Sequence, residues 1–517
     1  MRRLVIGCSV LLDPHFRVMY DEVESAFLDG EDVVFASCGG GCRACVSNPH
    51  AGRIQCICCS TMCRWLERRF RNRIKVVHFP KMPTYDRRFE FEDVKQLKDI
   101  VYKGVNIGYA AFSEYVSLTR DLLENLTEEK KRYMAYLLGA ACGYVDVAEK
   151  LINDYAPDSV SVYNGRMFET RPFFELARLK AIPVKINEVI TVQLDADTIE
   201  FRHLDFCNCF PQDVDGYAAK VRECWSRSKL SDADKRCAAS EFFNKRRNGV
   251  AAGDAVGSAH NGVFVKKQVK GLLPEGFDAT KHNVVIFNSS EDELCSIDKD
   301  FESHALFLSH IEGVKTVARI LADHPDYHVY LRIHPNLTGV NQPYHLLLHD
   351  LPKEFGNLTV LPADSKYSTY DLMDAAEKVV VLGSTAGVES TYWRRPVILI
   401  GSAMYYQLDV AYKPKDAGEL SKLLLTQGLQ PKPIDDALKY AYYVTRNSEL
   451  GTPSRVVDLR SIRKRFHGNP RWVPTWRSLY IMWWVLDANL FNAVRMMIRG
   501  LARNVLPIAK SEKCSAG

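Results

Sequence analysis

Short apolar runs alternate with amphipathic stretches along most of the chain. In the first 270 residues, runs such as RRLVIGCSV, DVVFAS and IKVVHF are separated by helical patterns, among them 16–29 and 171–180. From residue 284 the alternation starts again, with NVVIFNS, YHVYLRIHP, LTVLPA, KVVVLGS and PVILIG as the apolar runs. Strands that alternate with helices are typical of a parallel sheet covered by helices. We therefore predict an α/β fold with two Rossmann-like, doubly wound domains that face a cleft.

The pattern also sets the expected domain boundaries. We predict an N-terminal domain over 1–270, with a cysteine-rich insertion at 38–63, and a C-terminal domain over 280–450 that includes a helix over 304–325. Between them, GVAAGDAVGSAHNG at 249–262 is rich in small residues and lacks periodicity, which favours a linker or mobile loop. Residues 455–517 are basic and rich in tryptophan, and we predict a C-terminal helical extension there. This helix would lie in a membrane interface or pack against its own domains.

Composition narrows the class of protein. A length of 517 residues suits two domains, and 47% hydrophobic with 25% charged residues excludes a disordered chain or a coiled coil. The formal net charge of +5 is small, but basic residues gather at 64–73, at 245–247 and beyond 455. Such clusters form solvated faces or contact phosphates or an anionic membrane.

The start of the chain and its cysteines bear on location. The start, MRRLVIGCSVLLDPHF, reads as a first strand rather than a signal peptide. No stretch offers the roughly 20 apolar residues of a membrane span. Fifteen cysteines without an export signal are expected to be thiols or metal ligands. We expect a cytoplasmic protein, with peripheral attachment to the inner face of the plasma membrane if the tail binds lipid.

The most informative motif is KVVVLGSTAGVES. An apolar strand ends at Gly383, Ser384 and Thr385, and a helix begins near Gly387. The turn thus presents backbone N–H groups, two hydroxyls and a positive helix end to one point, which predicts a phosphate site. Glu389, in the first helical turn, can accept from ribose or sugar hydroxyls. The alternative is that Ser384 only caps the helix and Glu389 completes a capping arrangement.

Two other strands of the same predicted sheet end in polar residues. His334 precedes Pro335 directly after YLRI, and the proline holds the imidazole at the strand end, where it can donate to a phosphate oxygen. Ser289 and Ser290 follow VVIFN and either line the cleft near a donor or cap a helix. Three strand ends with such residues indicate a binding site more strongly than any one of them.

Strand ends in the first half supply further candidates. In SVYNGRMFETRP, Asn164 and Arg166 precede a helix, and arginine there suits carboxylate or phosphate recognition. Asp13 and His15 follow the first strand, and GYAAFSEY supplies Glu114. Each of these last three can deprotonate an acceptor hydroxyl, and the sequence does not choose among them.

The segment ASCGGGCRACVSNPHAGRIQCICCSTMCRW is unusually rich in cysteine. Cys38, Cys45, Cys56 and Cys59 have the spacing C-x6-C-x10-C-x2-C, which suits a structural zinc site. An iron–sulfur cluster, a redox switch or ordinary reduced thiols are the alternatives, because the first pair lacks the C-x2-C spacing. Extra cysteines at 42, 58 and 63 leave the ligand set open.

Taken together, these motifs resemble those of bacterial capsule and surface polysaccharide biosynthesis proteins. LLDPHF, CGGGCRACVSNP with CICC, VYNGR, FNSSEDE, RIHPN and GSTAGVES with RRPVI occur in order over residues 6–401. The resemblance is to the broad GT-B group with a His-Pro motif. It implies a glycosyltransferase whose C-terminal domain holds a nucleotide-sugar donor through His334, Ser384, Thr385 and Glu389. No DxD-type metal motif stands out, and the resemblance implies catalysis without a required cofactor.

The resemblance also sets the expected partners and the rival functions. The expected partners are a nucleotide-sugar donor, a glycan or lipid-linked glycan acceptor and an anionic membrane surface. Nucleic acid is not expected, because no reader motif accompanies the basic clusters. The alternatives are a nucleotide-sugar epimerase and a non-catalytic scaffold of a polysaccharide assembly complex.

Overall fold

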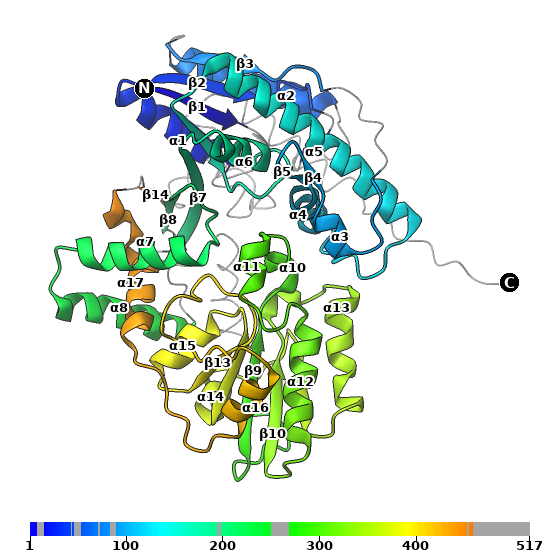
Figure 1. The fold of residues 1–517 in the computed structure, drawn as a ribbon. Helices are drawn as coiled ribbons and strands as arrows, with labels where there is room; N and C mark the ends of the chain where they lie inside the picture. Colours follow the sequence, from blue (N-terminus) through cyan, green and yellow to red (C-terminus); the bar gives the residue numbers. More distant parts are fainter. Residues whose placement is uncertain are drawn as a thin grey trace, which may run out of the picture. The chain divides into compact units, whose positions relative to one another are not determined.

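Two large sheets with their helices, and one two-stranded sheet, make up most of the described part of the chain (Figure 1). The computed structural model describes residues 1–7, 15–42, 44–45, 53–70, 73–82, 89–193, 198–249, 268–451 and 454–458. Contacts divide the chain into two units. The first comprises Met1–Val192 and Arg202–Pro453, and the second comprises Gln193–Phe201 and the residues from Ser454 on.

The elements follow the order that the hydrophobic pattern predicts. Those up to residue 249 are β1 (Arg2–Gly7), α1 (His15–Leu28), β2 (Asp32–Ser37), α2 (Arg53–Arg69), β3 (Lys75–His78), α3 (Val94–Lys98), β4 (Val101–Tyr102), β5 (Val105–Asn106), α4 (Ile107–Thr119), α5 (Glu128–Tyr155), β6 (Ser159–Tyr163), α6 (Arg171–Leu179), β7 (Val184–Gln193), β8 (Thr198–Cys207), α7 (Val214–Arg227) and α8 (Asp232–Arg247). Those from residue 268 are β9 (His282–Asn288), α10 (Glu291–Leu294), α11 (Lys299–Ser303), α12 (His310–Ala322), β10 (Tyr327–Arg332), α13 (Pro343–Leu346), β11 (Leu358–Leu361), α14 (Thr369–Ala375), β12 (Lys378–Leu382), α15 (Ala386–Tyr392), β13 (Val397–Leu399), α16 (Ala417–Leu425), α17 (Asp435–Arg446) and β14 (Ser454–Asp458).

Both large sheets have doubly wound topology. The five-stranded sheet has the order β11-β10-β9-β12-β13, and its neighbours pair in parallel. The seven-stranded sheet has the order β14-β8-β7-β6-β1-β2-β3, with parallel pairing from β7 to β3. In each sheet the strand order reverses beside the first strand, at β9/β12 and at β1/β6. Right-handed crossovers then put helices on both faces, and the carboxyl ends at the reversal are the usual ligand site. The predicted fold class is confirmed.

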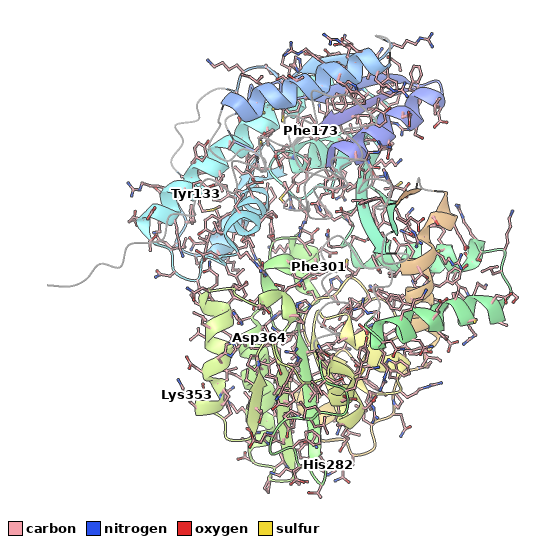
Figure 2. The ribbon with its side chains drawn as sticks, turned by 180° about the vertical axis from the view of Figure 1, so that it is seen from behind. Tyr133, Phe173, His282, Phe301, Lys353 and Asp364 are labelled. Carbon is pink, nitrogen blue, oxygen red and sulfur yellow. The ribbon has the colours of Figure 1, made fainter. Side chains whose placement is uncertain are left out.

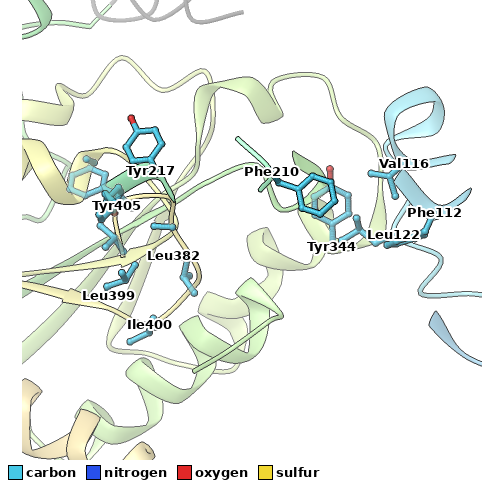
Figure 3. Packing of buried hydrophobic residues seen from close by; sticks show 14 of the residues in the cluster. Phe112, Val116, Leu122, Phe210, Tyr217, Tyr344, Leu382, Leu399, Ile400 and Tyr405 are labelled. Atoms are coloured by element: carbon cyan, nitrogen blue, oxygen red, sulfur yellow. The ribbon is translucent and has the colours of Figure 1, made fainter. Parts of the chain in front are cut away.

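The central strands of the five-stranded sheet are buried along most of their length because both faces of the sheet are covered. Val284, Val285 and Ile286 of β9 are fully buried, and so is every residue of β12. Figure 3 shows Leu382, Leu399 and Ile400 from β12, β13 and the residue after it, packed near Tyr405. Further along the chain, α17 packs against α7 and α8.

The structure differs from the expected elements in two places, and two further expected segments lie wholly or mostly outside the described residues. Within the cysteine-rich insertion expected at 38–63, helix α2 begins at Arg53 and runs to Arg69, an element that we did not predict from the sequence. The helix expected over 304–325 begins only at His310, because the Ser309 hydroxyl caps it. Most of the expected linker (250–262) and the tail beyond 458 lie outside the described residues. Within the described part of the chain, no helix is long and apolar enough to cross a membrane.

Candidate functional site

Three strand ends of the five-stranded sheet meet at one edge. The strands β10, β9 and β12 are neighbours, so their carboxyl ends adjoin. The backbone N–H of His334 donates to Asn288 Oδ1 at 2.9 Å, and the Ser289 hydroxyl donates to the Leu382 carbonyl at 2.6 Å. Asn288 also forms a β-bridge with Gly383. The expected gathering of these strand ends is confirmed, and we call Ser289, Ser290, His334, Gly383, Ser384 and Thr385 the strand-end cluster.

His334 is held as a neutral imidazole with a defined tautomer. Its Nδ1 accepts a hydrogen bond from the Asn336 backbone N–H at 3.2 Å. Burial, and then the charge of Arg332, lowers the pKa of His334 to about 4. A neutral imidazole carries one proton, so with Nδ1 accepting, that proton is on Nε2. His334 therefore presents an uncharged N–H donor at the strand end.

The turn after β12 depends on its glycines for different reasons. Gly383 has φ of +82°, where a side chain would be strained, and an added Cβ would come 2.7 Å from Leu294 Cδ1. Gly387 has an ordinary φ, but its Cβ would lie 2.7 Å from the Tyr405 hydroxyl oxygen. That hydroxyl donates to the Ser384 carbonyl at 2.5 Å. Gly387 thus makes room for Tyr405 beneath the turn.

The residue at the N-cap of helix α15 is Thr385, whose side chain makes no cap hydrogen bond, and Ser384 lies one residue before it. The Ser384 hydroxyl accepts from the Ala386 N–H at 3.3 Å. The N–H of Gly387 bonds to the Ser384 carbonyl, and that of Val388 to the Thr385 carbonyl. Three N–H groups that the sequence assigned to a phosphate are therefore already paired within the turn.

Glu389 is paired inside the protein. It is buried, its Oε1 lies 3.1 Å from Arg246 Nη2, and the Tyr370 hydroxyl donates to its Oε2. These two partners, from α8 and α14, were not found from the sequence. The expected role of Glu389 as an acceptor for sugar hydroxyls remains a prediction, and such binding would have to share the carboxylate with Arg246 and Tyr370.

Ser290 belongs to a network that the sequence did not reveal. Arg120, directly after α4, donates to Ser290 Oγ at 2.7 Å and to both carboxylate oxygens of Asp292. Ser290 and Tyr344 donate to the same carboxylate at 2.7 and 3.1 Å. Burial opposes the charge on Asp292, but the hydrogen bonds from Arg120 and Ser290 outweigh it and lower the Asp292 pKa. We call this network the Arg120 clasp.

Asn164 and Arg166 lie at the other strand end that the sequence singled out. Asn164 has φ of +61° and donates to Glu188 Oε2 at 2.8 Å. Arg166 Nη1 donates to the Glu293 carbonyl of α10 at 3.1 Å, and burial lowers the pKa of its guanidinium. Arg166 thus touches the segment that follows Ser289 and Ser290, so the structure brings these candidates from the two halves of the sequence together.

Glu114 does not have the environment expected of a general base. Its side chain is 1% exposed, and both carboxylate oxygens are buried without a hydrogen-bond partner. Burial, and then the charge of Glu169, raises the pKa of Glu114 well above its usual value. A continuous apolar run around Glu114 was the missed signal, because a helix that is apolar on all sides is usually buried. Asp13 lies outside the described residues, and only the backbone of His15 is described.

The cysteines of the N-terminal half gather without forming a metal site in the described residues. Cys56 and Cys59 lie three residues apart on α2, and Cys38 follows β2. Burial raises the pKa of Cys45, with further contributions from Glu169, Cys38 and Cys59, whereas a hydrogen bond from Cys42 lowers the pKa of Cys38 to about 7. No group of three or more histidine, cysteine, aspartate or glutamate side chains among the described residues is arranged to hold a metal. Zinc binding by Cys38, Cys45, Cys56 and Cys59 remains a prediction.

Comparison with known families finds a match within the second half of the chain. Residues 278–415 match the family described as "Capsule polysaccharide biosynthesis protein". The match spans the strand-end cluster. The expected resemblance to this family is confirmed. No curated protein sequence matches the chain.

Solved structures give weaker likenesses. A KpsC beta Kdo 2,4 transferase from Thermosulfurimonas dismutans is 13% identical, over 55% of this chain and 79% of its own, with a TM-score of 0.34. A UDP-GlcNAc 2-epimerase from Neisseria meningitidis, bound to UDP-GlcNAc, is 9% identical over 87% of this chain and all of its own, with a TM-score of 0.28. Such scores carry no argument, so the fold rests on the strand order and the candidate site on its own geometry.

Proposed function

We propose that this chain, with the capsule polysaccharide biosynthesis match at residues 278–415, is a GT-B-type glycosyltransferase. It moves a sugar from a nucleotide-sugar donor to a growing surface glycan. The observation that carries the proposal is the meeting of the carboxyl ends of β10, β9 and β12, next to the reversal of strand order at β9/β12, where parallel α/β sheets bind ligands. His334 follows β10, and Ser384 and Thr385 follow β12 on the other side of β9.

The reaction is displacement at the anomeric carbon of the donor. The acceptor oxygen forms a bond to that carbon, and the bond to the phosphate oxygen of the nucleotide breaks. Negative charge grows on the leaving phosphate, and His334 donates a hydrogen bond to it, with the hydroxyls of Ser384 and Thr385 as further donors in this proposal. Because the imidazole of His334 already carries its N–H as a neutral group, it needs no proton uptake before it donates this hydrogen bond.

The acceptor hydroxyl loses its proton to a general base. Such a base must be ionised at the working pH, and Glu114 with its raised pKa does not meet that condition. Asp13 and His15, which follow β1 in the sequence, remain the candidates. They follow the strand at which the order of the seven-stranded sheet reverses.

The acceptor in this proposal is a glycan, free or attached to lipid, and the enzyme acts in the cytoplasm. The basic, tryptophan-rich residues beyond 458 support attachment to an anionic membrane surface, which would bring the enzyme to a lipid-linked acceptor. Truncation after Gly468 should then release the protein from anionic liposomes in a flotation assay. Equal flotation of both forms, or of neither, would assign the tail a structural role.

Nucleotide binding provides the first test. Thermal-shift measurements with CMP, UDP, GDP and CDP should identify one nucleotide that stabilises the protein, because a ligand that binds only the native state raises its stability. His334→Ala should abolish that stabilisation without changing the melting temperature of the free protein. A wild-type protein that no nucleotide stabilises would remove the donor site from the proposal.

A further inference from the structure

A cavity lies beside the strand-end cluster. Its volume is about 260 Å³, and it is lined from α3, α4 and the residues after α4 on one side and from α10 to α12 on the other. One wall is the back of the turn after β12. Leu294 and Ser402 line the cavity, and an added Cβ on Gly383 would come 2.7 Å from Leu294 Cδ1 and from the Ser402 carbonyl oxygen.

The cavity walls combine apolar rings with carboxyl groups. Phe112, Leu122, Phe301 and Phe307 supply apolar surface, and Glu124, Glu291 and Glu302 supply the acids. Figure 3 shows Phe112 and Leu122 on the α4 side, and Figure 2 marks Phe301 on α11. A cavity below the usual 300–1,000 Å³ of drug-sized ligands suits a single small ring.

The cavity lining contains more acidic than basic side chains. Lys98 is the one lysine or arginine in the lining, and its Nζ lies 2.6 Å from Glu302 Oε1, where it also contacts the Phe112 ring. Its charge is therefore already neutralised. Three carboxyl groups thus face a single lysine in the lining, so an anionic ligand would be repelled.

The polar groups suit a ligand with hydroxyl groups. Tyr109 and Lys98 each donate to one oxygen of Glu302, and a carboxylate has further lone pairs that accept from hydroxyls. Burial raises the pKa of Glu291 to about 8, so at neutral pH it is a protonated acid that both donates and accepts. His310 donates its backbone N–H to Glu291 at 3.1 Å, which fixes the position of the acid.

We infer that this cavity is a subsite for one uncharged sugar residue of the acceptor glycan. A sugar ring places its C–H face against the phenylalanine and leucine side chains and its hydroxyls on the carboxyl groups of Glu302 and Glu291. An acidic sugar, such as a uronic acid, is excluded by the charge of the cavity. The inference rests on the proposed transferase function, and its position beside Gly383 puts the acceptor next to the donor site.

The test compares matched sugars that differ in one carboxylate. Saturation-transfer NMR on the full chain is run with the methyl glycosides of glucose and galactose, and with those of glucuronic and galacturonic acid. At least one neutral glycoside should give a signal, and its acidic counterpart should bind about tenfold more weakly or not at all. Equal or stronger binding of the acidic sugar would overturn the inference.

Two variants locate the binding. Ala305→Trp fills the cavity and should abolish the signal of the neutral sugar, whereas Ala305→Ser should keep it. Glu124→Lys, at an exposed position, should shift the preference toward the uronic acid, and Glu275→Lys, an exposed glutamate outside the lining, should not. An unchanged signal in Ala305→Trp, or an unchanged preference in Glu124→Lys, would overturn the inference.

Nucleotide binding separates the two proposals. Failure of every glycoside to bind, in protein that a nucleotide still stabilises, rejects the acceptor subsite and leaves the donor site standing. If no nucleotide stabilises the wild-type chain, the donor site is rejected. The saturation-transfer result then tests the sugar subsite on its own.

Discussion

The guanidinium of Arg120 holds the carboxylate of Asp292 through two hydrogen bonds, of 2.6 and 3.1 Å. It also donates to Ser290 Oγ and, at 3.0 Å, to the Asn336 carbonyl beside His334. The residue after α4 thus fixes two of the three strand ends of the candidate site.

Arg120→Met should destabilise the protein and loosen this site. Hydrogen bonds to charged groups contribute about 1.5–3 kcal/mol each, and Asp292 would be left buried without its cation. Urea unfolding should show a loss in that range, larger than for Arg132→Met on the exposed face of α5. Adding Asp292→Asn should lower the free energy of unfolding less in the Arg120→Met protein than in the wild type. Independent, additive losses would contradict the clasp.

Because the carboxyl of Glu114 is buried, we predict that its substitution stabilises the folded protein, and that this effect grows with pH. Its folded pKa lies above the unfolded value, so the stability it contributes is complete at low pH and is lost as pH rises above about 4.5. Glu114→Gln should therefore be more stable than the wild type at pH 8, because an amide needs no proton uptake on folding, whereas burying the carboxyl costs about 1.4 kcal/mol for each unit by which its pKa is raised. The difference should vanish near pH 4.

Thermal unfolding across pH 4–8 measures this effect. Glu90→Gln, at an exposed position, serves as the control and should show no such trend. A Glu114→Gln variant that is less stable than the wild type at pH 8 would show that the charged carboxylate has a stabilising partner in solution.

Metal analysis decides the cysteine hypothesis. If Cys38, Cys45, Cys56 and Cys59 bind zinc, the purified protein should contain about one zinc per chain by elemental analysis. Cys59→Ser should then lose the metal and lower the melting temperature, whereas Cys237→Ser, at an exposed position on α8, should keep both. Metal-free protein of normal stability would mean that the four cysteines are thiols.

The strand-end cluster could be predicted because it follows from the local sequence and from the regular geometry of a parallel sheet. Each apolar run marks a strand, and parallel strands bring their carboxyl ends to one edge, so Ser289, His334 and Ser384 could be placed together from the sequence. These features depend on neighbours in the chain or on a regular sheet.

The partners of the cluster were not predictable because they come from distant segments. Arg120 and Asp292 are 172 residues apart, and Arg246 and Glu389 are 143 apart. The sequence around each of these residues contains no signal that would identify its partner. The helix α2 was missed because its cysteines drew attention to metal-ligand spacing, although the segment Arg53–Arg69 also reads as a helix with arginines in its last turn.

The pKa of His334 predicts how activity depends on pH. Because the imidazole is neutral down to about pH 4, its titration should not limit the rate between pH 5 and 8. His334→Ala should lower kcat about 100- to 1,000-fold, the usual loss for one donor to a developing negative charge. The shape of the pH profile above pH 5 should be unchanged. A step near pH 6.5 that disappears in His334→Ala would show that the charged imidazole acts instead.

Turnover of a nucleotide-sugar donor tests the central claim most directly. The full chain is incubated with CMP-, UDP- and GDP-sugars, with and without glycan acceptors, and both the released nucleotide and the fate of the sugar are followed by mass spectrometry. We predict release of one nucleotide with the sugar joined to an acceptor or to water, and its loss in His334→Ala. Conversion of the sugar while it stays on its nucleotide would identify an epimerase, and the absence of any turnover in folded, nucleotide-binding protein would identify a scaffold; either result would contradict the claim.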